Sequence, residues 1–172
     1  MFFARTIYPL LSLLTASFAS PDCKVSPADS AWPSSDDWAA LNHSIGGVLL
    51  ETAPVASSCY PGNPFNSPEN CTDIQAQWSY SAYHAAWPES IDFPIYTNNS
   101  CIPKGATGWS KSRGCSIGGL PRYIVNATRL EHISEAMKWA SQRNIRIVVK
   151  GTGHDLNGRY VTSEDPNLHI SH

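Results

Sequence analysis

The residues best suited to chemistry stand together in one glycine-rich segment, which runs from Lys150 to Gly158. Its glycines allow the backbone to adopt positive φ and to approach a ligand closely. Successive backbone N–H groups in such a turn form a concavity for anions, phosphate above all, and Lys150 would add positive charge. His154 carries a nucleophilic imidazole, and Asp155 beside it could orient or polarise that ring. The segment therefore predicts a phosphate-binding turn that presents a histidine.

Two familiar phosphate motifs are excluded by the residues themselves. Position 156 is leucine and no helix pattern follows the glycines, so the dinucleotide fingerprint GxGxxG is absent. The segment also lacks the GK[ST] of a P-loop. His154, His169 and His172 do not have the regular spacing of metal ligands, and we expect no metal site. On loop chemistry alone, a histidine with a purely structural hydrogen bond remains the alternative to a reactive one.

Two β-favouring runs precede the glycine-rich turn. Residues Tyr123 to Val125 form the first run, and residues Ile145 to Val149, apolar apart from Arg146, form the second. A helix is predicted between them, and two strands joined by a crossover helix are expected to run parallel. Leu168-His169-Ile170 predicts the start of a third strand.

The helix between the first two strands has a predicted cap and a predicted buried face. Thr128 with Glu131 fits a capping box at the start of the helix. Apolar residues recur at helical spacing and are expected to face the core: Leu130, Ile133, Met137 and Ala140.

The first two-thirds of the chain is richer in loops. A helix is predicted from Asp37 to Ser44, with Trp38, Leu41 and Ile45 on one face and a cap at Ser35 or Asp36, followed by a strand at Val48-Leu49-Leu50. A second helix is predicted from Thr72 to about Tyr80. Residues 53–70 and 86–114 are rich in proline and have no periodicity. Three aromatic residues of this part are expected to pack in the core or in loops rather than to line a site: Tyr83, Trp87 and Trp109.

The chain has five cysteines, which an oxidising compartment would pair. We predict the pairs Cys59–Cys71 and Cys101–Cys115, because both close short loops, although the sequence alone does not fix the connectivity. Cys23 would then be left over. No CxxC is present, which argues against a zinc site.

Residues 1–19 have the layout of a secretory signal peptide: one basic residue, a short apolar run and small residues before Ser20. No later segment is apolar enough to span a membrane. Four glycosylation sequons agree with a secreted, extracellular protein, at Asn42, Asn70, Asn98 and Asn126. The net charge of -2 and the absence of a basic run indicate neither nucleic acid nor membrane as a partner.

The stretch from Cys115 to Arg159 resembles the FAD-binding PCMH-type domain of the vanillyl-alcohol oxidase (VAO) family. The resemblance rests on Tyr123–Thr128 and on Asn144–Arg159, and it is strongest to the berberine-bridge-enzyme-like oxidases of fungi. Asp37–Asn42 and Cys115–Gly119 are similar to the secreted branch that includes isoamyl alcohol oxidase-like proteins. The resemblance implies an α+β fold: the N-terminal β-α-β part of that domain in residues 115–172, preceded by a loop-rich, disulfide-stabilised extension in residues 20–114.

The resemblance also implies a cofactor and a chemistry. His154 corresponds to the family's 8α-histidyl link to FAD, and the surrounding backbone corresponds to the part that holds the pyrophosphate. The implied cofactor-binding residues are Lys150, Gly151, Thr152, Gly153, His154, Asp155 and Gly158. An alcohol, sugar or secondary metabolite would give a hydride to the flavin, and O2 would then accept the electrons and form hydrogen peroxide.

Two departures from the family pattern bear on function. No cysteine follows His154, so the family's second covalent link has no counterpart, and no catalytic base is assigned. A β-α-β unit with a third strand just beginning cannot close a sheet, so we expect the chain to be an N-terminal fragment of a longer oxidase. The alternative, from a different class of protein, is a non-catalytic secreted glycoprotein that retains the scaffold of such an oxidase.

Overall fold

The computed structural model describes residues 23–65, 67–159 and 168–171. The predicted signal peptide lies outside these residues. The fold is α+β, as predicted, and its centre is a four-stranded mixed sheet in the order β1-β2-β4-β3. The strands in that order are Leu49–Glu51, Tyr123–Asn126, Leu168–Ser171 and Ile147–Lys150. Strand β1 runs antiparallel to β2, while β4 runs parallel to both of its neighbours.

The predicted β-α-β unit is present, but its two strands are not neighbours. Helix α4 (Leu130–Gln142) connects β2 to β3, and both strands run in the same direction. Strand β4, the predicted third strand, lies between them, so that His169 pairs with Ile124 on one side and with Val148 on the other. All four residues of β4 are buried. The third strand therefore forms the centre of the sheet rather than a new edge.

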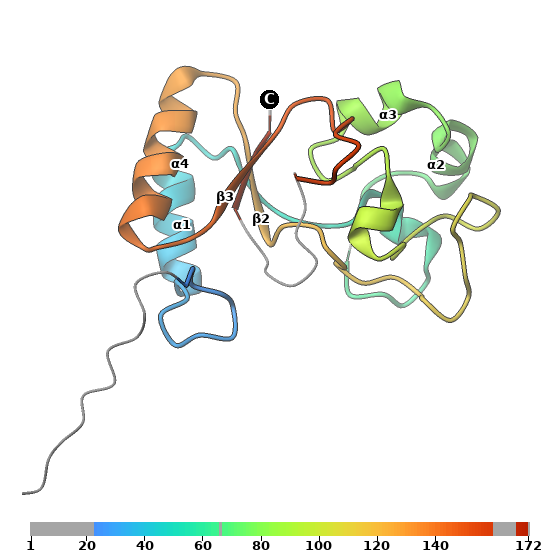
Figure 1. Ribbon diagram of the computed structural model, residues 1–172, viewed down its shortest axis with the longest axis horizontal. Coiled ribbons are helices and arrows are strands. Elements are labelled where there is room, and N and C mark those ends of the chain that lie inside the picture. The colour runs from blue at the N-terminus through green and yellow to red at the C-terminus, as the bar shows by residue number, and fades with distance from the viewer. Residues whose placement is uncertain (1–22, 66, 160–167, 172) are drawn as a thin grey trace, which may run out of the picture.

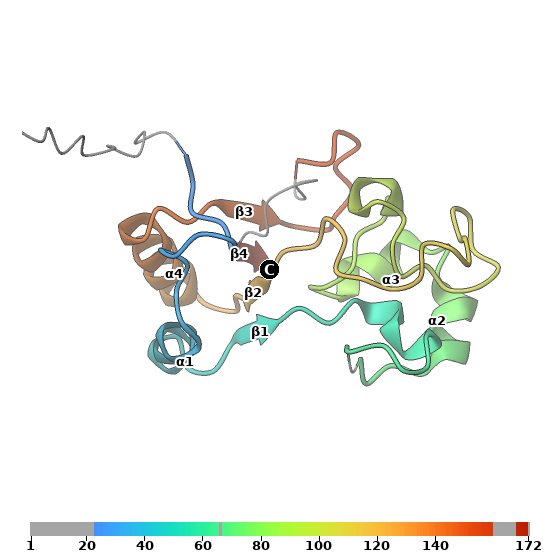
Figure 2. The ribbon, with the colours of Figure 1, turned by 90° about the horizontal axis from the view of Figure 1, so that it is seen from below.

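Helices α1 (Ser35–Ser44) and α4 cover one face of the sheet (Figures 1 and 2). The predicted face of α1 is confirmed, because Trp38, Leu41 and Ile45 enter the main core cluster. The Trp38 ring stacks on Tyr123 of β2, with 4.0 Å between ring centroids. The N-cap of α1 is Ser34, which forms a capping box with Asp37. The predicted cap, Ser35 or Asp36, is therefore wrong by one or two residues.

The predicted cap and buried face of α4 are wrong in part. The Arg129 N-cap has no side-chain cap bond, and the Thr128 N–H instead donates to Nδ1 of His132 at 3.3 Å. Leu130 is 79% exposed and Met137 50% exposed. The buried residues of the helix are His132, Ala136 and Ala140. The two alanines let the helix lie close to the sheet, and this requirement for small size is invisible to a pattern based on hydrophobicity alone.

A second part of the chain, the disulfide lobe (residues 52–121), lies on the opposite side of the sheet from α1 and α4 (Figures 1 and 2). It contains α2 (Cys71–Gln77), α3 (Ser81–Ala86) and two 3-10 helices, η1 (Val55–Cys59) and η2 (Pro94–Thr97). The single helix predicted from Thr72 to Tyr80 stops at Gln77, and a separate short helix begins at Ser81 because Tyr80 adopts an extended backbone conformation.

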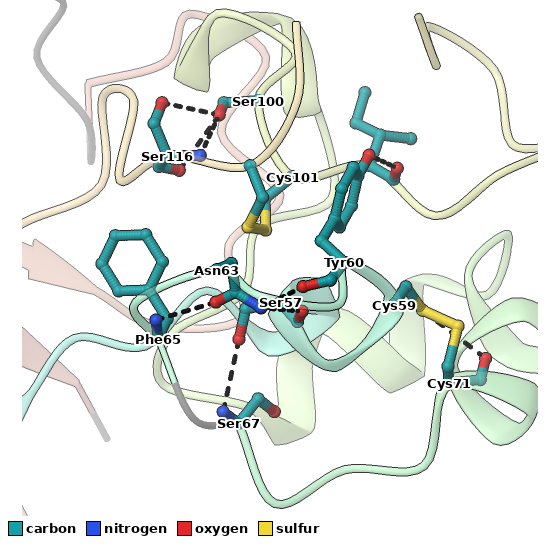
Figure 3. Close-up of a disulfide and its surroundings, with 12 residues drawn as sticks. Ser57, Cys59, Tyr60, Asn63, Phe65, Ser67, Cys71, Ser100, Cys101 and Ser116 are labelled. Carbon is teal, nitrogen blue, oxygen red and sulfur yellow. Dashed lines mark hydrogen bonds between the residues drawn. A yellow bond between two sulfur atoms is a disulfide. The ribbon is translucent and has the colours of Figure 1, made fainter. Parts of the chain in front are cut away.

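Both predicted disulfides form in this lobe, and Cys23 is free and exposed. The Tyr60 hydroxyl, next to the first disulfide, donates to the carbonyl oxygen of Ile102, next to the second (Figure 3). The lobe therefore has its own cross-linked frame. Tyr83 is buried with Trp87 packed against it, and Trp109 is half-buried, which agrees with the expected packing roles.

Side chains alternate between the two faces of a strand, so the residues of β4 and β3 that do not face the helices face the disulfide lobe. Val148 packs there against Ile91 and Leu120 of the lobe. Strand β1 and helix α1 belong to the predicted extension, yet they share the sheet and core of residues 115–172. Within the described parts of the chain, no helix is long and apolar enough to cross a membrane.

Candidate functional site

The glycine-rich turn follows β3 and opens onto a cavity of about 640 Å³. Five residues of the turn and the residue that follows it line this cavity, together with β3: Gly151, Thr152, Gly153, His154, Asp155 and Arg159. Gly153 has a φ of 81°, and a Cβ added to Gly151 would meet nothing within 4 Å, so the backbone is uncovered at that point. The N–H groups of Thr152, Gly153 and His154 have no hydrogen-bond partner among the described residues. Three consecutive donors without a partner in the described part of the chain are available to bind phosphate oxygens.

The His154 imidazole lies at the wall of this cavity and is held from one side. Its Nδ1 is 3.2 Å from Oδ2 of Asp92, which belongs to the disulfide lobe. The side chain of His154 is 42% exposed and that of Asp92 only 14% exposed. The ring is therefore accessible to a ligand while its orientation is fixed by a largely buried carboxylate.

Asp155 does not orient His154, contrary to the prediction. Its carboxylate accepts hydrogen bonds from the Arg159 guanidinium at 2.8 and 3.2 Å, and from the backbone N–H groups of Asn157 and Arg159. The Arg159 side chain and then the Asn157 N–H lower the pKa of Asp155 to about 2. Asp155 thus bonds within the turn and to Arg159. Although it is next to His154 in the sequence, its carboxylate points toward these other partners.

The side chain of Lys150 lies beneath the turn and is buried. Its Nζ donates to the carbonyl oxygens of Trp87 at 2.8 Å and of His84 at 3.4 Å, both in the disulfide lobe. Burial lowers the pKa of Lys150 to about 8, with Glu89 acting in the opposite direction. The ammonium therefore connects the turn to the lobe and does not line the cavity. The prediction that Lys150 adds positive charge directly to the phosphate-binding turn is wrong in this respect.

Tyr96 of η2 supports the far end of the turn. Its hydroxyl donates to the carbonyl oxygen of Leu156, and its ring lies against Gly158. A Cβ on Gly158 would lie closer than 3.0 Å to three atoms of that ring. Gly158 is thus needed for packing and for its φ of 64°, and it does not line the cavity.

Asp92 and Tyr96 were not among the residues predicted for this site. Both lie in a proline-rich segment without periodicity, and no motif there indicated a link to the turn. His84 has no sequence signal either; it is buried, and its two ring nitrogens lie 2.7 Å from Ser90 Oγ and from the Trp78 carbonyl oxygen. Burial lowers the pKa of His84. Within the described residues, no group of three or more His, Cys, Asp or Glu side chains is placed to hold a metal ion.

Known proteins with similar sequences are fungal flavoproteins. The chain is 35% identical over 156 residues to the FAD-linked oxidoreductase patO of Penicillium expansum, covering 90% of this chain and 26% of that protein. It is 38% identical over 152 residues to the VAO-type flavoprotein oxidase VAO615 of Thermothelomyces thermophilus, covering 87% and 26%. No protein-family model matches the chain.

Solved structures agree with the sequence comparison. The crystal structure of the VAO-type flavoprotein MtVAO615 from Myceliophthora thermophila C1 matches with a TM-score of 0.74 and 36% identity, over 87% of this chain and 26% of that one. The structure of MtVAO713 from the same organism matches with a TM-score of 0.73 and 32% identity, over 88% and 26%. Over the region that aligns, the sequence and the fold of this chain are similar to those of VAO-type flavoproteins. The chain spans about a quarter of the length of these VAO-type relatives.

The turn has a donor set that suits FAD. The N–H groups of Thr152, Gly153 and His154, which have no partner among the described residues, could donate to the oxygens of a pyrophosphate, and Gly151 leaves room for its approach. A second cavity of about 750 Å³, lined by Trp78, Phe93 and Pro94 among others, lies on the disulfide lobe. Asp92 lines this cavity as well, and its carboxylate contacts His154 at the wall of the first cavity.

Proposed function

We propose that this chain is the flavin-attachment part of an FAD-dependent oxidoreductase, with FAD joined covalently to His154. The observation that carries the proposal is the half-exposed imidazole on the wall of a cavity, in a turn with three backbone N–H groups that have no partner among the described residues. The names of the relatives, FAD-linked oxidoreductase and VAO-type flavoprotein oxidase, support the same cofactor. FAD supplies the hydride chemistry when bound.

The residues of the chain bind and orient the cofactor in this proposal. The N–H groups of the turn hold the pyrophosphate, and His154 bonds to the 8α-methyl carbon. That bond replaces one methyl C–H and the imidazole N–H by a single C–N bond, and the two hydrogen atoms removed pass in the end to O2, which becomes hydrogen peroxide. A covalent link of this kind raises the flavin's redox potential and favours substrate oxidation.

The substrate proposed for the whole protein is a small molecule, namely an alcohol, a sugar or a secondary metabolite, with O2 as the electron acceptor. The word oxidase in the name of VAO615 supports the choice of O2. We also propose that the protein is secreted and glycosylated. The two disulfides support an oxidising compartment, and the side chains of Asn70, Asn98 and Asn126 are exposed.

The second candidate is a secreted glycoprotein that keeps the scaffold without catalysis. The intact donor set of the turn and the accessible imidazole favour the flavoprotein.

A test of attachment separates the two candidates. The chain is produced with FAD and precipitated with acid, and the washed pellet is examined for yellow colour and flavin fluorescence. The wild-type pellet is expected to retain flavin, and His154→Ala to lose all of it. The exposed His43→Ala is the matched control and should retain as much as the wild type. A colourless wild-type pellet contradicts covalent attachment in this chain.

A further inference from the structure

The carboxylate that contacts His154 comes from a distant part of the chain. Asp92 lies between α3 and η2 in the disulfide lobe, and its Oδ2 is 3.2 Å from Nδ1 of the imidazole. At this distance a hydrogen on Nδ1 is donated to the carboxylate. In the neutral ring, the nitrogen that donates is the one that carries the hydrogen, so the lone pair is left on Nε2.

The carboxylate is itself held in place before any ligand arrives. The hydroxyl of Ser81, the first residue of α3, donates to the same Oδ2 at 2.9 Å. Asp92 is only 14% exposed, and a hydrogen bond in such a partly desolvated position is stronger than one in water. The order of contacts is therefore Ser81 to Asp92 to His154, in which each group limits the freedom of the next.

The other charged groups near the turn are engaged elsewhere. Asp155 is bonded to Arg159 and to the backbone of the turn. Lys150 is bonded to carbonyl oxygens of the disulfide lobe. Among the described residues, Asp92 is the carboxylate within bonding distance of the imidazole.

We propose that Asp92 is the positioning residue of His154: it fixes the orientation of the ring at the cavity wall and keeps the hydrogen on Nδ1. The effect of this positioning on covalent flavin attachment rests on the proposed function. A bond from the imidazole to the methyl carbon would leave the ring cationic until it loses a proton, and the neighbouring Asp92 carboxylate would stabilise that charge. The disulfide lobe thus takes part in preparing the attachment site.

The first test needs no flavin. The chain is labelled with 15N-histidine, and the hydrogen position on His154 is read from the nitrogen chemical shifts at neutral pH, with His154→Gln used to assign the signals. Nδ1 is expected to carry the hydrogen in the wild type, and Asp92→Asn to shift the population toward hydrogen on Nε2. Asp73→Asn removes an exposed carboxylate of the same lobe and should leave the wild-type signals unchanged. Equal tautomer populations in wild type and Asp92→Asn overturn the proposal.

The second test measures the rate of covalent flavin attachment after FAD is added to the flavin-free chain. Asp92→Asn is expected to slow attachment roughly ten- to a hundredfold, by analogy with the loss of a group that orients a metal-binding histidine. Ser81→Ala keeps Asp92 and its charge, so a smaller slowing is expected, and this variant replaces Asp92→Asn if the latter does not fold. Attachment at the wild-type rate in both variants also overturns the proposal. A wild type that takes up no flavin, but whose tautomer depends on Asp92, refutes the proposed function and leaves the positioning role standing.

Discussion

His169 is buried in the central strand β4, and neither ring nitrogen has a hydrogen-bond partner among the described residues. Burial, reinforced by the nearby charge of Lys150, lowers the pKa of His169 to about 3. The ring is therefore neutral in the folded chain at a pH where the unfolded chain binds a proton. Since the unfolded state binds more protons between pH 6.5 and 3, stability is lost as the pH falls through that range.

The variant His169→Leu tests this at the scale of one residue. The free energy of unfolding, measured in urea from pH 7 to pH 5, is expected to fall less steeply in the variant than in the wild type. The difference in slope is at most about 1.4 kcal/mol per pH unit, the value for one proton. The exposed His43→Leu is the control and should keep the wild-type slope. Parallel curves for wild type and His169→Leu would show that His169 does not titrate differently in the folded and unfolded states.

Gly158 is the second residue for which the structure gives a sharp expectation. Its φ of 64° disfavours any side chain, and a Cβ would also run into the Tyr96 ring. Gly158→Ala is therefore expected to cost more than the roughly 1–2 kcal/mol of the left-handed conformation alone. Gly62→Ala is the matched control, because Gly62 has a φ of 80° and open space around its Cβ position. If urea unfolding gives equal losses for both variants, the contact with Tyr96 does not constrain the turn.

At the scale of elements, helix α4 shows why size matters as much as hydrophobicity. Ala136 is fully buried against the sheet, whereas Leu130 is largely exposed. Ala136→Leu is expected to lower the free energy of unfolding by about 1–3 kcal/mol through overpacking. Leu130→Ala should change it by less than about 0.5 kcal/mol, as is usual at the surface. A larger loss for Leu130→Ala than for Ala136→Leu in urea titrations would contradict the observed rotation of the helix.

The sequence predicted elements better than it predicted their partners. The strands, helix α1 and both disulfides could be inferred because periodicity and short loops are local features. The position of β4 between β2 and β3 could not, since several strand orders satisfy the same pattern. The glycine-rich turn was recognisable by composition, but its histidine bonds to Asp92 and not to the adjacent Asp155. Such contacts depend on how the lobe lies against the sheet, and a single sequence does not contain that information.

At the scale of the whole molecule, contacts from both the disulfide lobe and the sheet hold the turn in place. The lobe provides Asp92 to His154, Tyr96 to the far end of the turn and backbone carbonyls to Lys150. The turn itself follows β3 of the sheet. The order of the lobe should therefore influence the turn, although the two are far apart in the sequence.

Removal of the Cys101–Cys115 disulfide tests this dependence, because the bond ties down the segment that directly follows η2. The double variant Cys101→Ser/Cys115→Ser is expected to lose about 2–4 kcal/mol of unfolding free energy. Amide hydrogens of the turn should exchange faster in this variant. Those of β2 and β4 should exchange faster only to the extent that global stability falls. The matched control is Cys59→Ser/Cys71→Ser, which opens the disulfide between η1 and α2 and should affect the turn less at equal loss of stability. Equal exchange of the turn in both double variants would mean that the sheet alone holds it in place.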